Sequence, residues 1–286
     1  MSEATRRVVG LVVLAVLVAA GCTVAGLWQW QRGDEREQAV ATLRANYTAE
    51  PAELGELIAA PDAALPEALT WRPVAVTGRY VPGSTVLLRN RPVDGKPAFH
   101  VLAALEVDEP GSPFDGALLV IDRGWVPIGT DATGELDVPA PPEGTVTVEA
   151  RVRPAESRSS RTAPAGQVHT IHPEQVLAAS GTTGSFVARA YGGLVAETPA
   201  PDVVLGPLPV PSTDLGPHRS YAMQWWMFAL GALVGFGILA WRERRDDDAT
   251  QTRAHAVREP RRRRRPSAED EEDALIEAQA SETSSR

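Results

Sequence analysis

The sequence predicts a membrane protein in which two transmembrane helices flank one mainly antiparallel β domain of the α+β class. Residues 8–28 and 221–241 are apolar runs without a charged residue, each long enough to cross about 30 Å of hydrocarbon as a helix. Between them, apolar and polar residues alternate as they do in half-buried strands. Beyond residue 241 charged residues dominate, and this stretch completes the predicted architecture as a disordered C-terminal tail.

The first apolar run, residues 8–28, follows Arg6 and Arg7 and ends at Trp28, whose ring favours the level of the lipid headgroups. A cleaved signal peptide is one alternative to a retained helix. A lipoprotein signal is another, in which Cys22 becomes a lipidated N-terminus. The run continues past Cys22 without a polar tether, so we expect an uncleaved helix.

The middle region, residues 29–217, is expected to form the β domain. A helix over residues 34–43 is expected to continue out of the membrane, and the proline-rich stretch 200–217 is expected to be an extended connector. The alternating pattern predicts a sheet or a partly open barrel with a few helices. The predicted strands are residues 71–81, 85–90, 99–107, 117–125, 145–152 and 185–191, with a short helix over 172–179.

The second apolar run belongs to a predicted helix over residues 218–241. On this helix His218, Tyr221 and Trp225 stand at positions i, i+3 and i+7 and therefore share one face. Such a face on a spanning helix usually contacts protein or a cofactor, because lipid offers no polar partners. The alternative is an aromatic belt at the membrane interface with a solvated histidine, and the spacing alone leaves both open.

Arginines next to the two runs predict the orientation. Arg6 and Arg7 precede the first helix, and Arg242, Arg244 and Arg245 follow the second. Because positively charged flanks stay in the cytoplasm, both termini are predicted to be cytoplasmic, residues 1–7 included. Residues 29–217 are then extracytoplasmic.

The tail, residues 242–286, contains a basic run at 261–265 and an acidic run at 269–273. Opposite charge blocks with few apolar residues build no core, so this segment is predicted to be disordered in the cytoplasm. The acidic run would compete with nucleic acid for the basic one, and we expect no nucleic-acid partner. The net charge of −9 comes partly from this tail and says little about the partners of the β domain.

The sequence shows no motif of an enzyme active site. A Gly-rich phosphate loop, a GxSxG motif and an HExxH motif are all missing. His169 and His172 are too few for a metal site, and His100 is expected to be a satisfied residue within a strand. We therefore predict that the protein is not an enzyme.

Three separate blocks resemble one known family. They are residues 26–32 (GLWQWQR), the sheet region 72–127 with DRGWVP at residues 122–127, and residues 218–225 (HRSYAMQW). They are similar to the GxWQxxR, DRGWVP and HxxYAxQW motifs of the surfeit locus protein 1 family, and the chain looks like a bacterial member. Within DRGWVP, Asp122 and Arg123 point to opposite faces of a strand, and we expect Arg123 to have a structural role with a carboxylate partner.

The resemblance implies an assembly factor for haem-copper cytochrome c oxidase in the bacterial cell membrane, with haem a as a candidate cofactor. It makes His218 the candidate axial ligand of the haem iron, since neutral imidazole is a good iron ligand. Tyr221 and Trp225 would line the macrocycle, and Trp28 would face it from the first helix. The implied partners are the catalytic subunit of the oxidase, the haem a synthase and the lipid bilayer.

A second class of function stays open beside the haem carrier. In it the protein is a membrane module without cofactor that stabilises an oxidase subunit or an assembly intermediate. A haem-modifying enzyme is a third class, which the lack of an acid/base or redox cluster disfavours.

Overall fold

The computed structural model describes residues 3–128, 138–258 and 272. It divides into two compact units, Met1–Gln31 together with Pro217–Arg286, and Arg32–Gly216. The first is called the helical unit below. The second contains every strand that the structure describes and is called the sheet domain.

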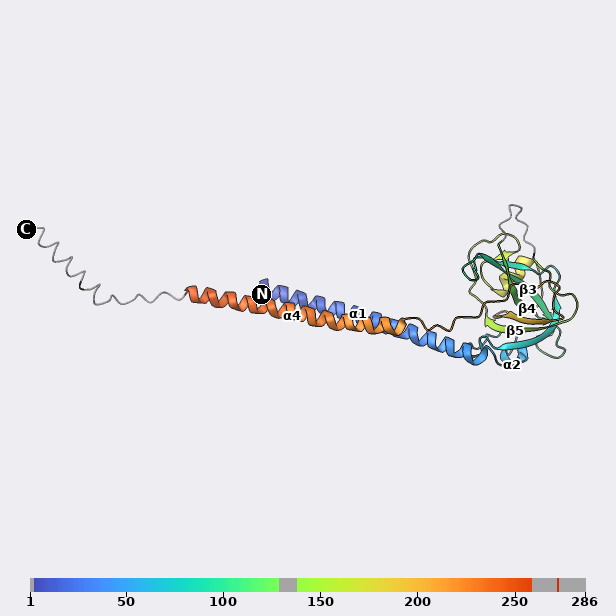
Figure 1. Cartoon of the computed structure of the whole chain (residues 1–286), viewed down its shortest axis with the longest axis horizontal. Coiled ribbons are helices and arrows are strands. Elements are labelled where there is room, and N and C mark those ends of the chain that lie inside the picture. Colours follow the sequence, from blue (N-terminus) through green and yellow to red (C-terminus); the bar gives the residue numbers. More distant parts are fainter. Residues whose placement is uncertain (1–2, 129–137, 259–271, 273–286) are drawn as a thin grey trace, which may run out of the picture. The chain divides into compact units, whose positions relative to one another are not determined.

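Two long helices make up the helical unit (Figure 1). They are the first part of α1 (Glu3–Asn46) and α4 (His218–Arg258), which run antiparallel, since Arg7 meets Glu243 at one end and Gln29 meets His218 at the other. Both contain windows long and apolar enough to cross a membrane, with mean hydropathies of 2.7 and 1.6. The predicted pair of apolar helices with a sheet domain between them in sequence is confirmed.

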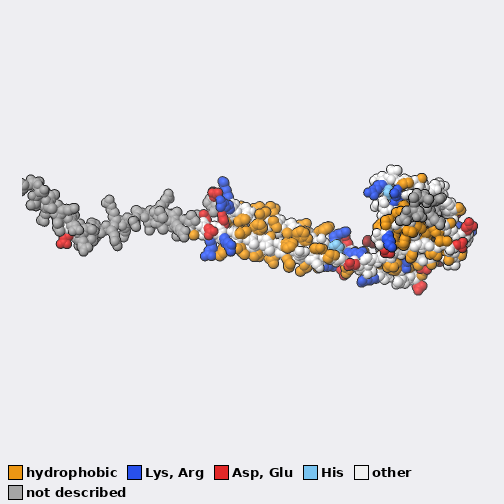
Figure 2. Space-filling view, turned by 45° about the horizontal axis from the view of Figure 1, so that its top comes forward, with side chains coloured by type: hydrophobic (Ala, Val, Ile, Leu, Met, Phe, Trp, Pro, Cys, Tyr) orange, Lys and Arg blue, Asp and Glu red, His pale blue; other side chains and the backbone are white. Residues whose placement is uncertain are grey.

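Small residues form the seam between the two helices. Ala15 and Ala19 of α1 and Ala222 and Ala229 of α4 are buried, while most of the larger apolar side chains around them are exposed. Figure 2 shows these hydrophobic side chains along the helical unit, with charged side chains gathered at its ends. Close approach at small residues is how helices pack when lipid offers no hydrophobic driving force, and the large residues are then left facing outward.

The second helix is longer than predicted. We expected it to end at residue 241 and the chain to be disordered from 242 onward, but α4 continues to Arg258. Residues 246–258 (DDDATQTRAHAVR) contain no glycine or proline, so nothing in them breaks a helix that is already nucleated. The rest of the predicted disordered tail lies outside the described residues, apart from Glu272.

The sheet domain is a seven-stranded sheet in the order β1-β5-β7-β4-β3-β2-β6. Because β3 also pairs with β1, the five strands β1, β5, β7, β4 and β3 close into a barrel. The strands are β1 (Pro73–Tyr80), β2 (Val86–Leu88), β3 (Ala98–Val107), β4 (Leu118–Pro127), β5 (Val146–Pro154), β6 (Gln167–Val168) and β7 (Ala190–Thr198). The helices of the domain are the end of α1, α2 (Leu54–Leu57), the single 3₁₀ turn η1 (Glu67–Leu69) and α3 (Pro173–Ser180).

The barrel closes at a glycine. Gly78 of β1 lies opposite Val107 of β3, and a side chain there would collide with the carbonyl oxygen of Glu106. Closure of a small barrel brings neighbouring backbones this near, and only glycine leaves the space. Gly78 belongs to the VTGRY stretch of the sequence and marks the point where the predicted sheet becomes a barrel.

The pairing is mainly antiparallel, as predicted. Among the described residues, only β2–β6 and β4–β7 pair in parallel. The strand expected over 185–191 was placed too early, and β7 instead runs through Gly192 and Gly193 to Thr198. A Cβ at Gly192 would lie 2.8 Å from Ile121 and 2.9 Å from Ala150, so the glycine lets β7 fit between β4 and β5. The two-residue strand β6 was not predicted.

The barrel interior is apolar except for one buried polar cluster. Arg123 of β4 is 3% exposed, and its Nη2 lies 3.2 Å from Oε1 of Glu197 on β7. The hydroxyl of Tyr80 donates to Oε2 of the same carboxylate at 2.8 Å. Burial, followed by the charge of Glu197, raises the pKa of Tyr80 far above its usual 10, so this hydroxyl remains a donor. The expected carboxylate partner of Arg123 is therefore Glu197.

The proline-rich connector packs along the barrel. Gly206 exchanges two backbone hydrogen bonds with Trp125 at the end of β4, and the indole Nε1 of Trp125 donates to the carbonyl of Pro207 at 2.9 Å. A Cβ at Gly206 would overlap the Trp125 ring, so the connector needs glycine at this position. The connector is thus extended, as predicted, and fixed to the barrel by Trp125.

Candidate cofactor site at the mouth of the helix pair

His218 is the first residue of α4 and follows Pro217. The backbone amide of Tyr221 donates to the carbonyl of Pro217 at 3.0 Å and closes the first helical turn. The N-terminal end of a helix leaves amide hydrogens without carbonyl partners and carries a partial positive charge. His218 is half-buried at this end, where its ring has one side against α1.

The imidazole of His218 is held by Gln29 of α1. The Nδ1 atom lies 3.0 Å from the side-chain oxygen Oε1 of Gln29. An amide oxygen only accepts hydrogen bonds, so Nδ1 carries the hydrogen and donates it. The neutral ring then has its lone pair on Nε2, and the orientation of the ring is set by its hydrogen bond to Gln29.

An aromatic cluster also joins the two helices, next to Gln29 on α1 and about two turns beyond His218 on α4. Trp30 of α1 stacks on Trp226 of α4 with ring centroids 5.6 Å apart, and the guanidinium of Arg219 lies 3.9 Å from the centroid of Trp30. Gly26 of α1 lies directly under the Trp226 ring, and a Cβ there would overlap its Nε1 and Cδ1 atoms. These contacts fix the spacing of the two helices beside His218.

The predicted lining residues are largely exposed in the structure. Tyr221 is 48% exposed, Trp225 is 37% exposed and packs edge-to-face on Phe228, and Trp28 is 57% exposed. Tyr221 and Trp225 present their rings on the outer side of α4, next to the face that carries His218 and the buried Ala222. In the described part of the chain, no hydrogen bond or ring stacking joins Trp28 to His218, Tyr221 or Trp225.

The residues present fit a haem with one axial ligand from this chain. The Nε2 atom of His218 is free of the Gln29 hydrogen bond, and the exposed ring of Trp225 shares its face of α4. An imidazole whose other nitrogen donates to a carbonyl is the usual form of an iron ligand. Among the described residues there is no group of three or more His, Cys, Asp or Glu side chains that could hold a metal ion by themselves.

Sequence reasoning named Trp28 as the contribution of α1 and missed Gln29, Gly26 and Trp226. Gln29 and Gly26 are both letters of the GxWQxxR motif, so the signal was present. Trp226 follows the last letter of HxxYAxQW and carried no signal of its own. The motifs thus encode the contact between the helices, Gly26 against Trp226 and Gln29 against His218.

The sequence matches the SURF1 family over residues 16–230. This span contains all three motif blocks. The chain belongs to the SURF1 family. It is 34% identical over 245 residues to uncharacterized SURF1-like proteins of Mycobacterium bovis and of two strains of Mycobacterium tuberculosis, covering 82% of this chain and 84% of each relative.

The SURF1 match extends through the sheet domain as well as both helices. It includes Gly78 at the barrel closure and the buried Arg123. The matched span ends at residue 230, within α4, so the family model does not include the charged continuation of that helix.

Proposed function

We propose that this SURF1-family protein is an assembly factor for haem-copper cytochrome c oxidase, and that it holds haem a at His218 and assists its delivery to the catalytic subunit. The observation that supports this most directly is the hydrogen bond from Nδ1 of His218 to Gln29. It leaves Nε2 as the nitrogen that faces a ligand. The proposed role is that of a carrier and not of an enzyme.

The chemistry of the site agrees with a planar amphiphilic ligand. Haem a, when bound, would supply an iron that accepts the Nε2 lone pair of His218. The residues of this chain would orient the imidazole through Gln29 and offer apolar ring surface through Tyr221, Trp225 and Trp28. Since these three rings are exposed, they are also available to a second protein that receives the ligand.

The membrane supplies the setting for this function. We propose that α1 and α4 span the cell membrane with both ends of the chain in the cytoplasm and the sheet domain outside. Arginines at the predicted cytoplasmic ends, Arg6, Arg7, Arg242, Arg244 and Arg245, support this orientation. His218 then lies at the outer interface, where a polar side chain costs far less than at the bilayer centre.

The sheet domain is the proposed contact for the oxidase. A closed barrel offers a rigid surface, and the connector is hydrogen bonded to it at Gly206 and Trp125. The catalytic subunit is the proposed main partner, and the haem a synthase that would supply the cofactor is the proposed second one.

The test is the absorption spectrum of the full-length protein, purified from the membranes of cells that make haem a. We expect a haem band in the wild type and its loss or displacement in His218→Ala. The matched control is His169→Ala, which removes an imidazole of the sheet domain that contacts Asn90. It should leave the spectrum unchanged.

Two outcomes would redirect the proposal. A colourless wild-type protein from membranes that contain haem a would favour a cofactor-free module that stabilises an oxidase subunit or intermediate. An unaltered spectrum in His218→Ala would remove the axial role from this residue. Oxidase activity measured in the same cells reports whether loss of haem binding also stops assembly.

A further inference from the structure

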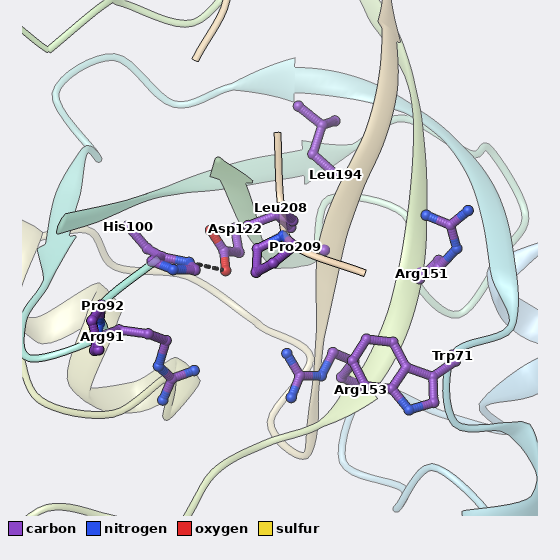
Figure 3. A pocket seen from close by; sticks show the side chains of 11 residues that line it. Trp71, Arg91, Pro92, His100, Asp122, Arg151, Arg153, Leu194, Leu208 and Pro209 are labelled. Atoms are coloured by element: carbon purple, nitrogen blue, oxygen red, sulfur yellow. Dashed lines mark hydrogen bonds and ion pairs between the residues drawn. The ribbon is translucent and has the colours of Figure 1, made fainter. Parts of the chain in front are cut away.

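The sheet domain contains a cavity of about 240 Å³ on the face shared by four neighbouring strands (Figure 3). Those strands are β5, β7, β4 and β3, which are consecutive in the sheet. The side chains that matter chemically are Arg91, His100, Asp122, Arg151 and Arg153, and the connector closes one side with Leu208. None of these residues belongs to the proposed haem site.

A missing side chain creates the cavity. Arg151 of β5, Gly193 of β7 and Asp122 of β4 lie opposite one another in one row across three strands. Because Gly193 has no side chain, its position in the row between Arg151 and Asp122 is empty. A Cβ at Gly193 would come within 3.2 Å of Leu208. The gap in the row is therefore built by the register of the sheet.

The guanidinium group of Arg153 lines the cavity next to two aromatic rings. Its guanidinium carbon is 4.3 Å from the ring centroid of Trp71 and 5.3 Å from that of Tyr191. Among the residues that the structure describes, none makes a hydrogen bond or an ion pair with the side chain of Arg153. Stacking holds a guanidinium in place without using its N–H donors, so the whole donor edge remains available.

Arg151 repeats this arrangement. Its guanidinium lies 3.7 Å from the centroid of the Tyr47 ring, and Nε donates to the carbonyl of Tyr47 at 3.0 Å. The two Nη groups have no partner in the described structure. Figure 3 shows the side chains of Arg151 and Arg153, both from β5, with their guanidinium groups pointing in different directions.

The charges around the cavity do not balance. Arg91 is neutralised by Glu156, which accepts two hydrogen bonds from it at 2.8 and 3.0 Å. Asp122 is the only carboxylate among the residues that line the cavity, against three arginines. One guanidinium charge is therefore left without a counter-charge when Glu156 and Asp122 are both counted. A half-buried cluster of this sign favours an anion.

A buried imidazole forms part of the wall. His100 is 4% exposed, and its Nδ1 lies 2.9 Å from Oδ2 of Asp122. The register between β3 and β4 shifts next to His100, because Arg123 of β4 is left without a partner on β3 between Gly124 and Asp122. The second nitrogen, Nε2, is buried without a partner in the described structure. His100 is thus only half satisfied, which departs from our expectation of a satisfied sheet residue.

We propose that this cavity binds a small organic oxyanion, either a carboxylate or a phosphate monoester. The forked N–H groups of Arg151 and Arg153 match the geometry of such an oxyanion. Since Nδ1 of His100 donates to Asp122, its Nε2 carries a lone pair, which can accept a hydrogen bond from a hydroxyl group on the organic part of the ligand. Since a water takes up about 30 Å³ in the liquid, the volume fits several heavy atoms beyond the charged group. Leu194, Leu208 and Pro209 provide the apolar wall for that remainder.

The test is isothermal titration of the full-length protein in detergent, in phosphate-free buffer, with glycerol 3-phosphate and with succinate as probes. We expect saturable binding of at least one of them. Sodium chloride at equal ionic strength should give none, because chloride lacks the paired oxygens. A lipid source of the same chemistry is tested by the unfolding temperature in nanodiscs with phosphatidic acid or with phosphatidylcholine. A rise that depends on phosphatidic acid alone would identify a headgroup.

Arg153→Lys is the diagnostic variant. Lysine keeps the positive charge and most of the aliphatic side chain but lacks the paired N–H donors of the guanidinium. The affinity for the anion should therefore fall about tenfold or more, the equivalent of one charge-assisted hydrogen bond. Arg151→Lys is the second variant, in case the first folds poorly. The matched control is Arg158→Lys, an exposed arginine paired with Glu174 beside a different hollow, and it should bind as the wild type does.

Clear results would overturn this proposal. Both diagnostic variants binding like the wild type would place the anion elsewhere, and loss of binding in Arg158→Lys would move it to the hollow beside that residue. Heat of binding no larger than that with sodium chloride, together with no effect of phosphatidic acid, would remove the site. None of these readouts uses haem absorption, so failure here leaves the haem proposal standing.

Discussion

The imidazole of His218 and the side-chain amide of Gln29 meet at 3.0 Å, although 189 positions separate them in the sequence. Each belongs to a different motif, GxWQxxR at the end of the apolar part of α1 and HxxYAxQW at the start of α4. The hydrogen bond therefore joins the two motifs into one site. It also selects Nε2 of His218 as the nitrogen left for a ligand.

Gln29→Leu should impair haem binding without removing the axial ligand. Leucine has a similar size but accepts no hydrogen bond, so the His218 ring loses its fixed orientation and its preferred tautomer. We expect haem content to fall about 10- to 100-fold, the usual cost of losing such a supporting contact. Gln29→Glu keeps an acceptor oxygen and should retain the band. Equal haem content in the wild type and Gln29→Leu would contradict the positioning role.

Gly26→Ala should disturb the helix pair. The new methyl group would overlap the Trp226 ring, which is stacked on Trp30 and cannot move without losing that contact. We expect less folded protein in the membrane and a weaker haem band. The matched control is Gly21→Ala on the same helix, where nothing lies within 4 Å of the added Cβ. That change should be neutral or slightly stabilising, because alanine is the better helix former. Immunoblotting of membranes and the haem spectrum measure both effects.

Local patterns predicted the elements that depend on local chemistry. The apolar runs located both helices of the helical unit, and alternation located β1 to β5. Where tertiary contact decides, the sequence misled. The strand predicted over 185–191 stops before Gly192, but β7 continues through Gly192 and Gly193 because Ile121 and Ala150 leave room for no side chain at Gly192.

The site was predicted in part for the same reason. His218 could be named from its motif, while its partner on α1 could not be distinguished from the neighbouring Trp28 by sequence alone. A helix places successive residues about 100° apart, so an error of one position turns a contact into an exposed ring. The cavity beside His100 depends on strand register and on a bulge, and neither leaves a pattern in the sequence.

Arg123→Met should destabilise the barrel by about 3–5 kcal/mol, because it leaves the buried carboxylate of Glu197 without its cation. Adding Glu197→Leu removes that carboxylate and should recover part of the loss. The recovery is incomplete, since the hydroxyl of Tyr80 then has no acceptor. Unfolding of the full-length chain in detergent measures both. Normal stability of Arg123→Met with failed oxidase assembly would instead make Arg123 a contact residue.

The Arg91–Glu156 pair should make the sheet domain sensitive to acid. Burial alone would raise the pKa of Glu156, but the hydrogen bonds from Arg91 and from the amide of Ile171 outweigh it and lower the pKa below its usual 4.5. The stability that this carboxylate contributes is therefore fully present above pH 4.5 and is lost as pH falls through the lower, folded-state value.

Glu156→Gln tests this. The variant should lower the free energy of unfolding by about 1–3 kcal/mol near pH 7, because the charged hydrogen bonds are lost. This difference in free energy of unfolding between variant and wild type should become smaller as the pH is lowered from 5 to 3. Glu50→Gln, at an exposed carboxylate, is the control and should show no such gap. Denaturant unfolding at a series of pH values gives the difference. A gap that stays constant over this range would mean that Glu156 titrates alike in the folded and unfolded chains.

The orientation of the helices can be tested with single cysteines in a Cys22→Ser background, which removes the native thiol. Thr183→Cys places a thiol at an exposed position just after α3 in the sheet domain, and Ser284→Cys places one near the end of the chain. In intact cells a membrane-impermeant maleimide should label Thr183→Cys and leave Ser284→Cys unlabelled until the cells are opened. The arginines that flank α1 and α4 predict this pattern, because positive flanks resist transfer across the membrane. The reverse pattern would place the sheet domain in the cytoplasm. The end of the helix pair at which His218 and Gln29 meet would then be on the cytoplasmic side, which is the wrong side for the proposed delivery of haem a.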